Sequence, residues 1–138
     1  KFEAGTQRVS QAVAFAAAVR YLQHLGMENV EAWEHELGAR LVEGVQKIEG
    51  VRLLGPADPS KRAGLVALAI EGVHPHDVGQ LLDTQGIAVR VGHHCAQPLH
   101  RCAGVTASTR ASTYIYNTTE DVDAFLKALA EVRPYFGL

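Results

Sequence analysis

The chain has 138 residues, of which 47% are hydrophobic, and its 13 basic and 15 acidic side chains give a formal net charge of -2. This length and apolar content predict one domain over residues 1–138 with a single core. Because no block of Lys or Arg is present, the composition argues against a nucleic-acid or membrane-surface partner. No stretch has the pattern of a signal peptide or a membrane span.

Four stretches carry apolar residues at helical spacing. They run from 7 to 25, from 30 to 48, from 75 until Gly86, and from a cap at Thr118 or Thr119 through 129. Gly26 and Gly50 are placed to end the first two helices, and Pro75 suits the first turn of the third.

Short branched or apolar runs between the helices predict strands. These runs cover 51–54, 65–70, 87–90 and 110–116. The first two are expected to form a hairpin-like pair, and residues 91–108 are expected to be a long loop. The order of elements predicts an α+β domain, with a small sheet of about four strands covered by helices.

The segment "RVGHHCAQPLH" at 90–100 gathers groups that bind metals or activate thiols. Zinc accepts ligands such as His93, His94, Cys95, His100 and Cys102. Structural zinc sites favour pairs about two to four residues apart on a turn, whereas three adjacent side chains on an extended loop point in different directions. We therefore expect no intrinsic metal site, although a solvated polar loop remains an alternative to a functional one.

A reactive thiol at Cys95 fits the segment better. One arginine and three histidines lie within five residues of it, and such donors stabilise a thiolate. A thiol on a mobile loop suits sulfur-carrier chemistry. Cys102 has only Arg101 as a close charged neighbour, so a tolerated surface thiol is the simpler interpretation there. Two cysteines are too few for a secreted disulfide scaffold, which predicts a cytoplasmic protein.

Four segments carry a family resemblance. They are "KFEAGT" (1–6), "GVHPHDVGQLLD" (72–83), "GIAVRVGHHCAQPL" (86–99) and "RASTYIYNTTEDVD" (110–123). In this order they resemble the C-terminal part of the group II, SufS-like cysteine desulfurases. Those enzymes belong to the class V aminotransferases of fold-type I and use pyridoxal 5′-phosphate (PLP). The resemblance implies the small C-terminal domain of such an enzyme.

The resemblance also implies a reaction. The enzyme's own cysteine takes the sulfur of L-cysteine as a persulfide, L-alanine leaves, and the sulfur serves iron–sulfur cluster assembly. A homodimer and a sulfur-acceptor protein of the SufU or SufE kind are the implied partners. Selenocysteine lyase activity, or a non-catalytic sulfur-carrier or docking module, are the alternatives.

Individual residues match the family's motifs. The persulfide-bearing cysteine falls on Cys95, and the arginine that binds the substrate carboxylate falls on Arg110, whose fork suits a carboxylate. Arg90 matches a second active-site arginine, with a strand-end surface charge as its alternative. Thr6 falls where the family places a hydroxyl that reaches the cofactor phosphate of the partner subunit. Capping of a helix is the other role open to Thr6.

His74 and His76 also match the family's pattern. Near a helix start, capping and surface polarity explain both residues. We also expect that His76, if it faces the Cys95 loop, contacts the zinc of a zinc-containing sulfur acceptor.

In this family, the lysine that binds the cofactor lies in a large domain upstream of the "FEAGT" segment. This chain contains the segment but not that large domain. The lysines here are Lys1, Lys47, Lys61 and Lys127, and none has a matching context. We therefore expect the chain alone to hold no PLP and to show no turnover. Apolar surface left bare by the missing domain is expected to cause self-association.

Overall fold

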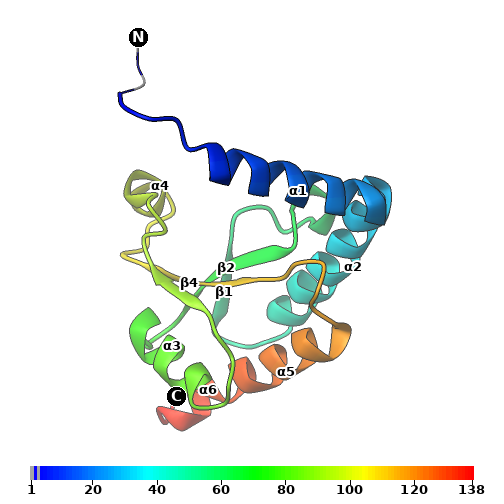
Figure 1. Ribbon diagram of the computed structural model, residues 1–138. Helices are drawn as coiled ribbons and strands as arrows, with labels where there is room; N and C mark the ends of the chain where they lie inside the picture. Colours follow the sequence, from blue (N-terminus) through cyan, green and yellow to red (C-terminus); the bar gives the residue numbers. More distant parts are fainter. Residues whose placement is uncertain (1, 3) are drawn as a thin grey trace. The chain divides into compact units, whose positions relative to one another are not determined.

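The computed structural model describes residue 2 and residues 4–138 (Figure 1). The helices are α1 (Val9–Leu25), α2 (Met27–Gln46), α3 (Pro75–Asp83), α4 (Gln97–Cys102), α5 (Thr119–Ala130) and α6 (Val132–Tyr135), with a short 3-10 helix, η1 (Pro59–Lys61). The strands are β1 (Val51–Leu54), β2 (Leu65–Ile70), β3 (Arg90–Gly92) and β4 (Ser108–Ser112). The chain divides into two compact units, Lys1–Trp33 and Glu34–Leu138.

The first unit contains α1 and the start of α2. Gly26, with a φ of 87°, ends α1, a backbone conformation that glycine adopts without steric cost. The residue before the helix is Arg8, and no side chain caps the helix start. Capping by Thr6 is therefore wrong, because the helix begins three residues after it, at Val9. No residue of α1 is buried.

The second unit is built on a four-stranded sheet in the order β1-β2-β4-β3. Every neighbouring pair is antiparallel. The first two strands have the predicted boundaries and pair as a hairpin, with Val51 opposite Ile70. The predicted α+β class, with a small sheet covered by helices, is confirmed.

The two faces of the sheet differ, as β2 shows. Val66, Leu68 and Ile70 are buried on one face, whereas the alternate residues, Leu65 and Ala67 among them, are partly or fully exposed on the other. Side chains alternate along a strand, so one face is committed to the core. Figure 1 shows α2, α3 and α5 on that side of the sheet.

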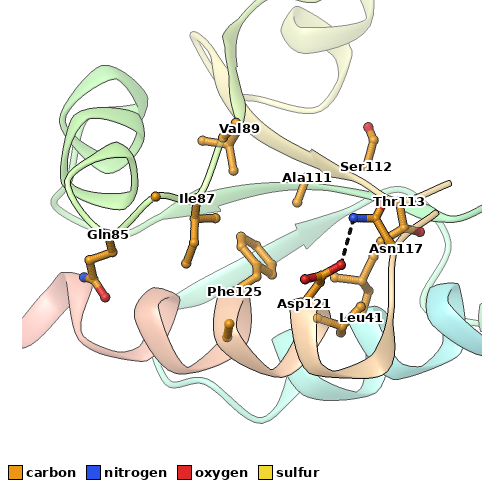
Figure 2. A pocket seen from close by; sticks show the side chains of 14 residues that line it. Leu41, Gln85, Ile87, Val89, Ala111, Ser112, Thr113, Asn117, Asp121 and Phe125 are labelled. Carbon is orange, nitrogen blue, oxygen red and sulfur yellow. Dashed lines mark hydrogen bonds between the residues drawn. The ribbon is translucent and has the colours of Figure 1, made fainter.

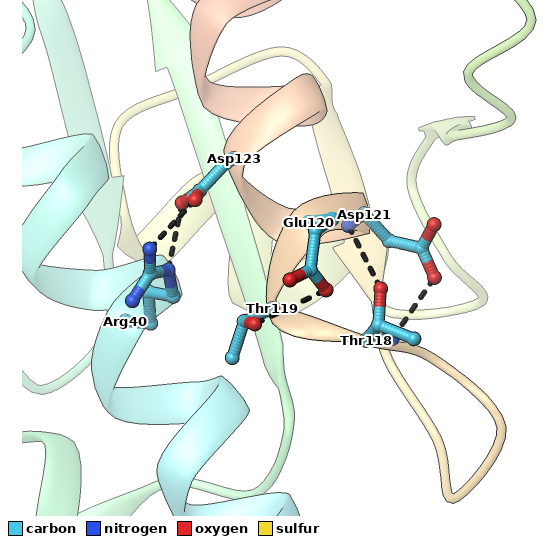
Figure 3. Close-up of polar contacts among 6 residues, drawn as sticks. All are labelled: Arg40, Thr118, Thr119, Glu120, Asp121 and Asp123. Carbon is cyan, nitrogen blue, oxygen red and sulfur yellow. Dashed lines mark hydrogen bonds and ion pairs between the residues drawn. The ribbon is translucent and has the colours of Figure 1, made fainter.

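Buried apolar side chains of α2 and α5 complete this core. They are Leu37, Leu41, Val42 and Val45 on α2, and Val122, Phe125, Ala128 and Leu129 on α5. At the surface, Arg40 of α2 donates two hydrogen bonds to Asp123 of α5, at 2.7 and 2.6 Å (Figure 3). This pair is exposed, so it adds little to stability compared with the apolar contact beneath it.

The start of α5 is fixed by a capping box (Figure 3). The Asp121 backbone N–H donates to Thr118 Oγ1 at 3.3 Å, and the Thr118 N–H donates to Asp121 Oδ2 at 3.0 Å. These bonds satisfy two donors that a helix start otherwise leaves unpaired. Of the two predicted caps, Thr118 is the one used.

The region after α3 corrects three predictions. The strand predicted at 87–90 lies at 90–92, and the strand predicted at 110–116 ends at Ser112. A turn follows that strand, in which the Tyr114 N–H donates to Asn117 Oδ1 at 2.9 Å. The loop predicted at 91–108 contains the end of β3 and all of α4. A six-residue helix is too short to show a hydrophobic period.

Candidate functional site

Two arginines lie opposite each other on the sheet. Arg90 of β3 pairs with Arg110 of β4, and Arg110 pairs with Ala67 of β2. Directly opposite residues share a face, so both arginines project from the side that the core helices leave free. Two like charges in this position repel unless an anion lies between them. The register therefore favours a bound anion at this point.

The Arg110 side chain is half-buried. Its Nε is enclosed and makes no hydrogen bond within the described residues. Leaving a buried donor unpaired costs about 1–3 kcal/mol, and more for a charged group. A carboxylate bound through the guanidinium fork offsets this cost.

Arg110 opens into a pocket of about 260 Å³ between α4 and the free face of the sheet. Apolar side chains form most of its wall, among them Leu54, Ala67, Leu99 and Ala103. Its polar groups are Arg110, His94, His100 and Ser108. A small apolar pocket with a few convergent polar groups has the usual character of a ligand site.

The thiol of Cys95 lies on a tight turn that links β3 to α4. The Ala96 N–H donates to the His93 carbonyl at 2.8 Å, and the two central residues, His94 and Cys95, have φ values of 52° and 60°. Within the described residues these two are the only non-glycine residues with positive φ. Such a conformation costs about 1 kcal/mol or more for each non-glycine residue and often marks a functional site.

Two histidines and one hydroxyl tie this turn to the sheet. Ser108 Oγ lies 3.0 Å from His94 Nε2 and 2.9 Å from His100 Nε2. His100 Nδ1 lies 2.9 Å from the Ala96 carbonyl. Ser108 is fully buried. Cys95 is exposed. The hydrogen bonds of His94 and His100 therefore anchor the turn, while the Cys95 thiol faces solvent.

The environment of His94 lowers its pKa. Burial is the largest cause, and the nearby positive charge of Arg110 is the next, followed by His100 and Arg90. These effects all disfavour an imidazolium, so the neutral ring is stabilised at neutral pH. The sequence predicted that His94 is one of the donors that stabilise a Cys95 thiolate. In the structure its Nε2 contacts Ser108 Oγ instead of the thiol.

The zinc alternative for this cluster finds no support. Within residue 2 and residues 4–138, no three His, Cys, Asp or Glu side chains are placed to hold a metal ion. Both ring nitrogens of His100 are within hydrogen-bonding distance of protein partners. Cys102 is exposed at the end of α4.

The remaining predicted residues are Thr6, His74 and His76. Thr6 is exposed in the first unit. His74 caps α3, with its Nδ1 accepting from the His76 N–H at 3.3 Å. The two imidazoles stack with ring centroids 5.3 Å apart. His76 is exposed, so its ring is open to a partner protein.

A second cavity, of about 370 Å³, lies on the core side (Figure 2). Ile87, Ala111 and Phe125 contribute apolar wall, and Asn117 and Asp121 form a polar rim. The Asn117 side chain donates to Asp121 Oδ2 at 3.2 Å. None of the candidate site residues lines this cavity, so we do not assign it to the site.

Sequence reasoning missed Ser108, the residue that joins the two histidines. The signal that could have found Ser108 is its position two residues before Arg110, because residues two apart in a strand share a face. The same register places Ala67 beside Arg110. The first relation was missed because the strand was predicted to begin at Arg110, whereas it begins at Ser108. The second relation is visible only once the strands are paired.

Comparison with known proteins identifies the family of the chain. Residues 1–125 match the family described as Aminotransferase class-V. The chain belongs to this family.

Similar proteins of the class-V aminotransferase family are named cysteine desulfurases. A probable cysteine desulfurase 2 of Mycobacterium leprae is 50% identical over 137 residues, which cover 99% of this chain and 33% of the relative. A probable cysteine desulfurase of Halalkalibacterium halodurans is 49% identical over the same length. The chain thus spans about a third of the length of these relatives.

Solved structures agree with the fold. The apo structure of a cysteine desulfurase from Thermococcus onnurineus matches with a TM-score of 0.90 and 41% identity, covering 99% of this chain and 34% of that one. The cysteine desulfurase CsdA of Escherichia coli, in an S-sulfonic acid form, matches with a TM-score of 0.86 and 34% identity, covering 96% of this chain and 32% of that one.

The resemblance to PLP enzymes raises the question of whether these residues hold the cofactor. Lys47, Lys61 and Lys127 are all exposed, and none lines the Arg110 pocket. Within the described residues, no amine is therefore placed to bind PLP beside the arginine pair.

No helix among the described residues is long and apolar enough to cross a bilayer.

Proposed function

We propose that this chain is the small C-terminal domain, over residues 1–138, of a group II, SufS-like cysteine desulfurase. The observation that carries the proposal is the cross-strand pair of Arg90 and Arg110, together with the turn that begins three residues after Arg90, at His93, and presents Cys95. Arg110, whose guanidinium we assign to carboxylate binding, opens into a pocket that is also lined by His94 and Ala96, the neighbours of the exposed Cys95. The similarity to proteins named cysteine desulfurases supports it.

In the proposed reaction, Arg110 and Arg90 bind the carboxylate of L-cysteine. The Cys95 thiolate attacks the substrate sulfur, so that an S–S bond forms and the substrate's C–S bond breaks. The products are L-alanine and a Cys95 persulfide. PLP, held by the remainder of a full-length enzyme, supplies the electron sink that C–S cleavage needs.

Mass spectrometry of a full-length enzyme carrying this sequence tests the proposal. After a single exposure to L-cysteine, the peptide with Cys95 is expected to gain the mass of one sulfur atom. Cys95→Ser is expected to abolish the gain, whereas Cys102→Ser leaves it unchanged. Extra sulfur on any other residue would refute the assignment. The isolated chain with added PLP is expected to release neither alanine nor sulfide.

The proposal includes the partners that the family implies. These are a second subunit, whose cofactor phosphate Thr6 reaches, and a SufU- or SufE-like acceptor that carries the sulfur toward iron–sulfur cluster assembly. His76, with its exposed ring, contacts the zinc of a zinc-containing acceptor. Unaltered sulfur transfer by His76→Ala would remove this contact from the proposal. We also propose a cytoplasmic location, because two cysteines are too few for a secreted disulfide scaffold.

Two other functions are tested by the same enzyme. Selenocysteine lyase activity predicts faster turnover of L-selenocysteine than of L-cysteine. A non-catalytic sulfur carrier or docking module predicts no turnover of either amino acid, even in the full-length protein.

A further inference from the structure

The pocket beside Arg110 contains buried polar atoms that lack a partner. Among the described residues, buried side-chain nitrogen or oxygen atoms without a hydrogen-bond partner occur on His94, Arg110 and Arg133. Two of these residues, His94 and Arg110, line this one pocket. Because an unpaired buried polar group is costly, their presence together indicates a place for the polar head of a ligand.

The charge of the pocket selects an anionic head. Among the described residues, no Asp or Glu lines it. The ion pairs found within this part of the chain involve neither Arg110 nor its cross-strand neighbour Arg90. Burial and the charge of Arg110 lower the pKa of His94, so this ring stays neutral at neutral pH. A guanidinium without an internal partner binds a carboxylate through paired hydrogen bonds.

The remaining wall of the pocket selects an apolar body for the ligand. Leu54, Ala67, Leu99 and Ala103 contribute most of that wall. Leu99 is 67% exposed, so a ligand chain that covers it removes apolar surface from water. The pocket volume of about 260 Å³ equals roughly eight or nine water molecules, which suits a carboxylate with a chain of about four to six carbons.

Hydrogen bonds hold the walls of the pocket in place before a ligand binds. Arg52 Nη2 donates to the Ala103 carbonyl at 2.6 Å, which attaches the end of α4 to β1. Ser108 Oγ lies 2.9 Å from His100 Nε2, which attaches the same helix to β4. A preformed pocket binds its ligand without the entropic cost of ordering its walls.

We propose that this pocket binds straight-chain aliphatic carboxylates, with the carboxylate at the Arg110 guanidinium and the chain between α4 and the free face of the sheet. The side chain of L-cysteine is short, so that substrate leaves much of the apolar wall uncovered. A longer aliphatic carboxylate therefore competes with L-cysteine in a full-length enzyme. The inference rests on the proposed function for this competition, but the binding itself does not depend on it.

Binding is tested by titrating the ¹⁵N-labelled full chain with acetate, butyrate and hexanoate and following the amide signals of the residues that line the pocket. Each added methylene is expected to tighten binding by about threefold, because it is buried against the apolar wall. Hexanoate is therefore expected to bind about tenfold more tightly than butyrate. Equal binding of acetate and hexanoate would overturn the inference, and so would equal binding of hexanoate and the uncharged hexan-1-ol.

Two variants test the placement of the ligand. Ala67 lies opposite Arg110 in the sheet, so Ala67→Leu fills the pocket and is expected to weaken hexanoate binding by about tenfold. Ala88→Leu, at the cavity on the core side, is the matched control and is expected to leave binding unchanged. Arg110→Gln is expected to remove the preference for hexanoate over hexan-1-ol. Unaltered hexanoate binding by Ala67→Leu, or an unaltered preference in Arg110→Gln, would overturn the inference.

Competition is tested in the full-length enzyme. Hexanoate is expected to raise KM for L-cysteine and to leave kcat unchanged, since both molecules use the Arg110 guanidinium. A KM that does not respond to hexanoate would overturn the inference without affecting the assignment of the persulfide to Cys95. Extra sulfur on another residue would instead refute the proposed function and leave the binding of hexanoate by the chain unaffected.

Discussion

Arg110 is the residue on which the candidate site depends most. Its strand neighbours Thr109 and Ala111 are buried in the core, so the strand fixes the direction of the arginine. Across the sheet it faces Ala67 and Arg90. A small residue on one side leaves room for a ligand, and a second positive charge on the other side attracts an anion.

Replacement of Arg110 by lysine tests the need for a planar fork. In a full-length enzyme, Arg110→Lys is expected to raise KM for L-cysteine by about tenfold or more, because an ammonium does not make the paired hydrogen bonds of a guanidinium. Steady-state kinetics measure the change. Arg40→Lys, on α2 and bound to Asp123, is the matched control. An unchanged KM for Arg110→Lys would show that the carboxylate binds elsewhere.

At the scale of elements, the turn and α4 are held more firmly than their loop-like sequence indicates. Ser108 binds both His94 and His100, and Arg52 Nη2 donates to the Ala103 carbonyl at 2.6 Å. The two ends of α4 are thus attached to β4 and β1. Tertiary contacts replace the intrinsic stability that a six-residue helix lacks.

The capping box of α5 gives a prediction at the same scale. Thr118→Ala is expected to lower the free energy of unfolding by about 1 kcal/mol, because it leaves helix donors unpaired. Urea denaturation measures the loss, with Thr119→Ala as the control. A loss no greater than that of the control would contradict the capping role.

Acid weakens the same helix start. The hydrogen bond from the Thr118 backbone, followed by that from Asn117, lowers the pKa of Asp121 from its reference of 3.8. A carboxylate with a lowered pKa in the folded state stabilises the fold above its unfolded pKa, and this effect is lost as pH falls through the folded pKa. Asp121→Asn is therefore expected to destabilise the chain at pH 7 and to lose this difference below pH 3.8. An equal difference at both pH values would refute the assignment.

At the scale of the whole molecule, the first unit exposes unusual apolar surface. Val13 of α1 is 63% exposed and Phe15 is 71% exposed. Exposed apolar surface of this kind favours association.

The isolated chain is accordingly expected to self-associate through α1. Sedimentation analysis at increasing protein concentration measures this, and Phe15→Lys is expected to weaken the association. Arg20→Lys, on the same helix, is the control that keeps the charge. A monomer at all concentrations, or equal association of Phe15→Lys and the unaltered chain, would refute the prediction.

The sequence by itself determined the helices α1, α2, α3 and α5 and the first two strands, because hydrophobic spacing and glycine or proline signals are local. It also determined the family, through ordered motifs around Cys95 and Arg110. Only the tertiary structure decided that residues 91–108 contain α4, that Arg90 lies opposite Arg110, and that Ser108 joins His94 to His100. These relations depend on strand register and on contacts between residues distant in the chain, and neither has a local periodic signal.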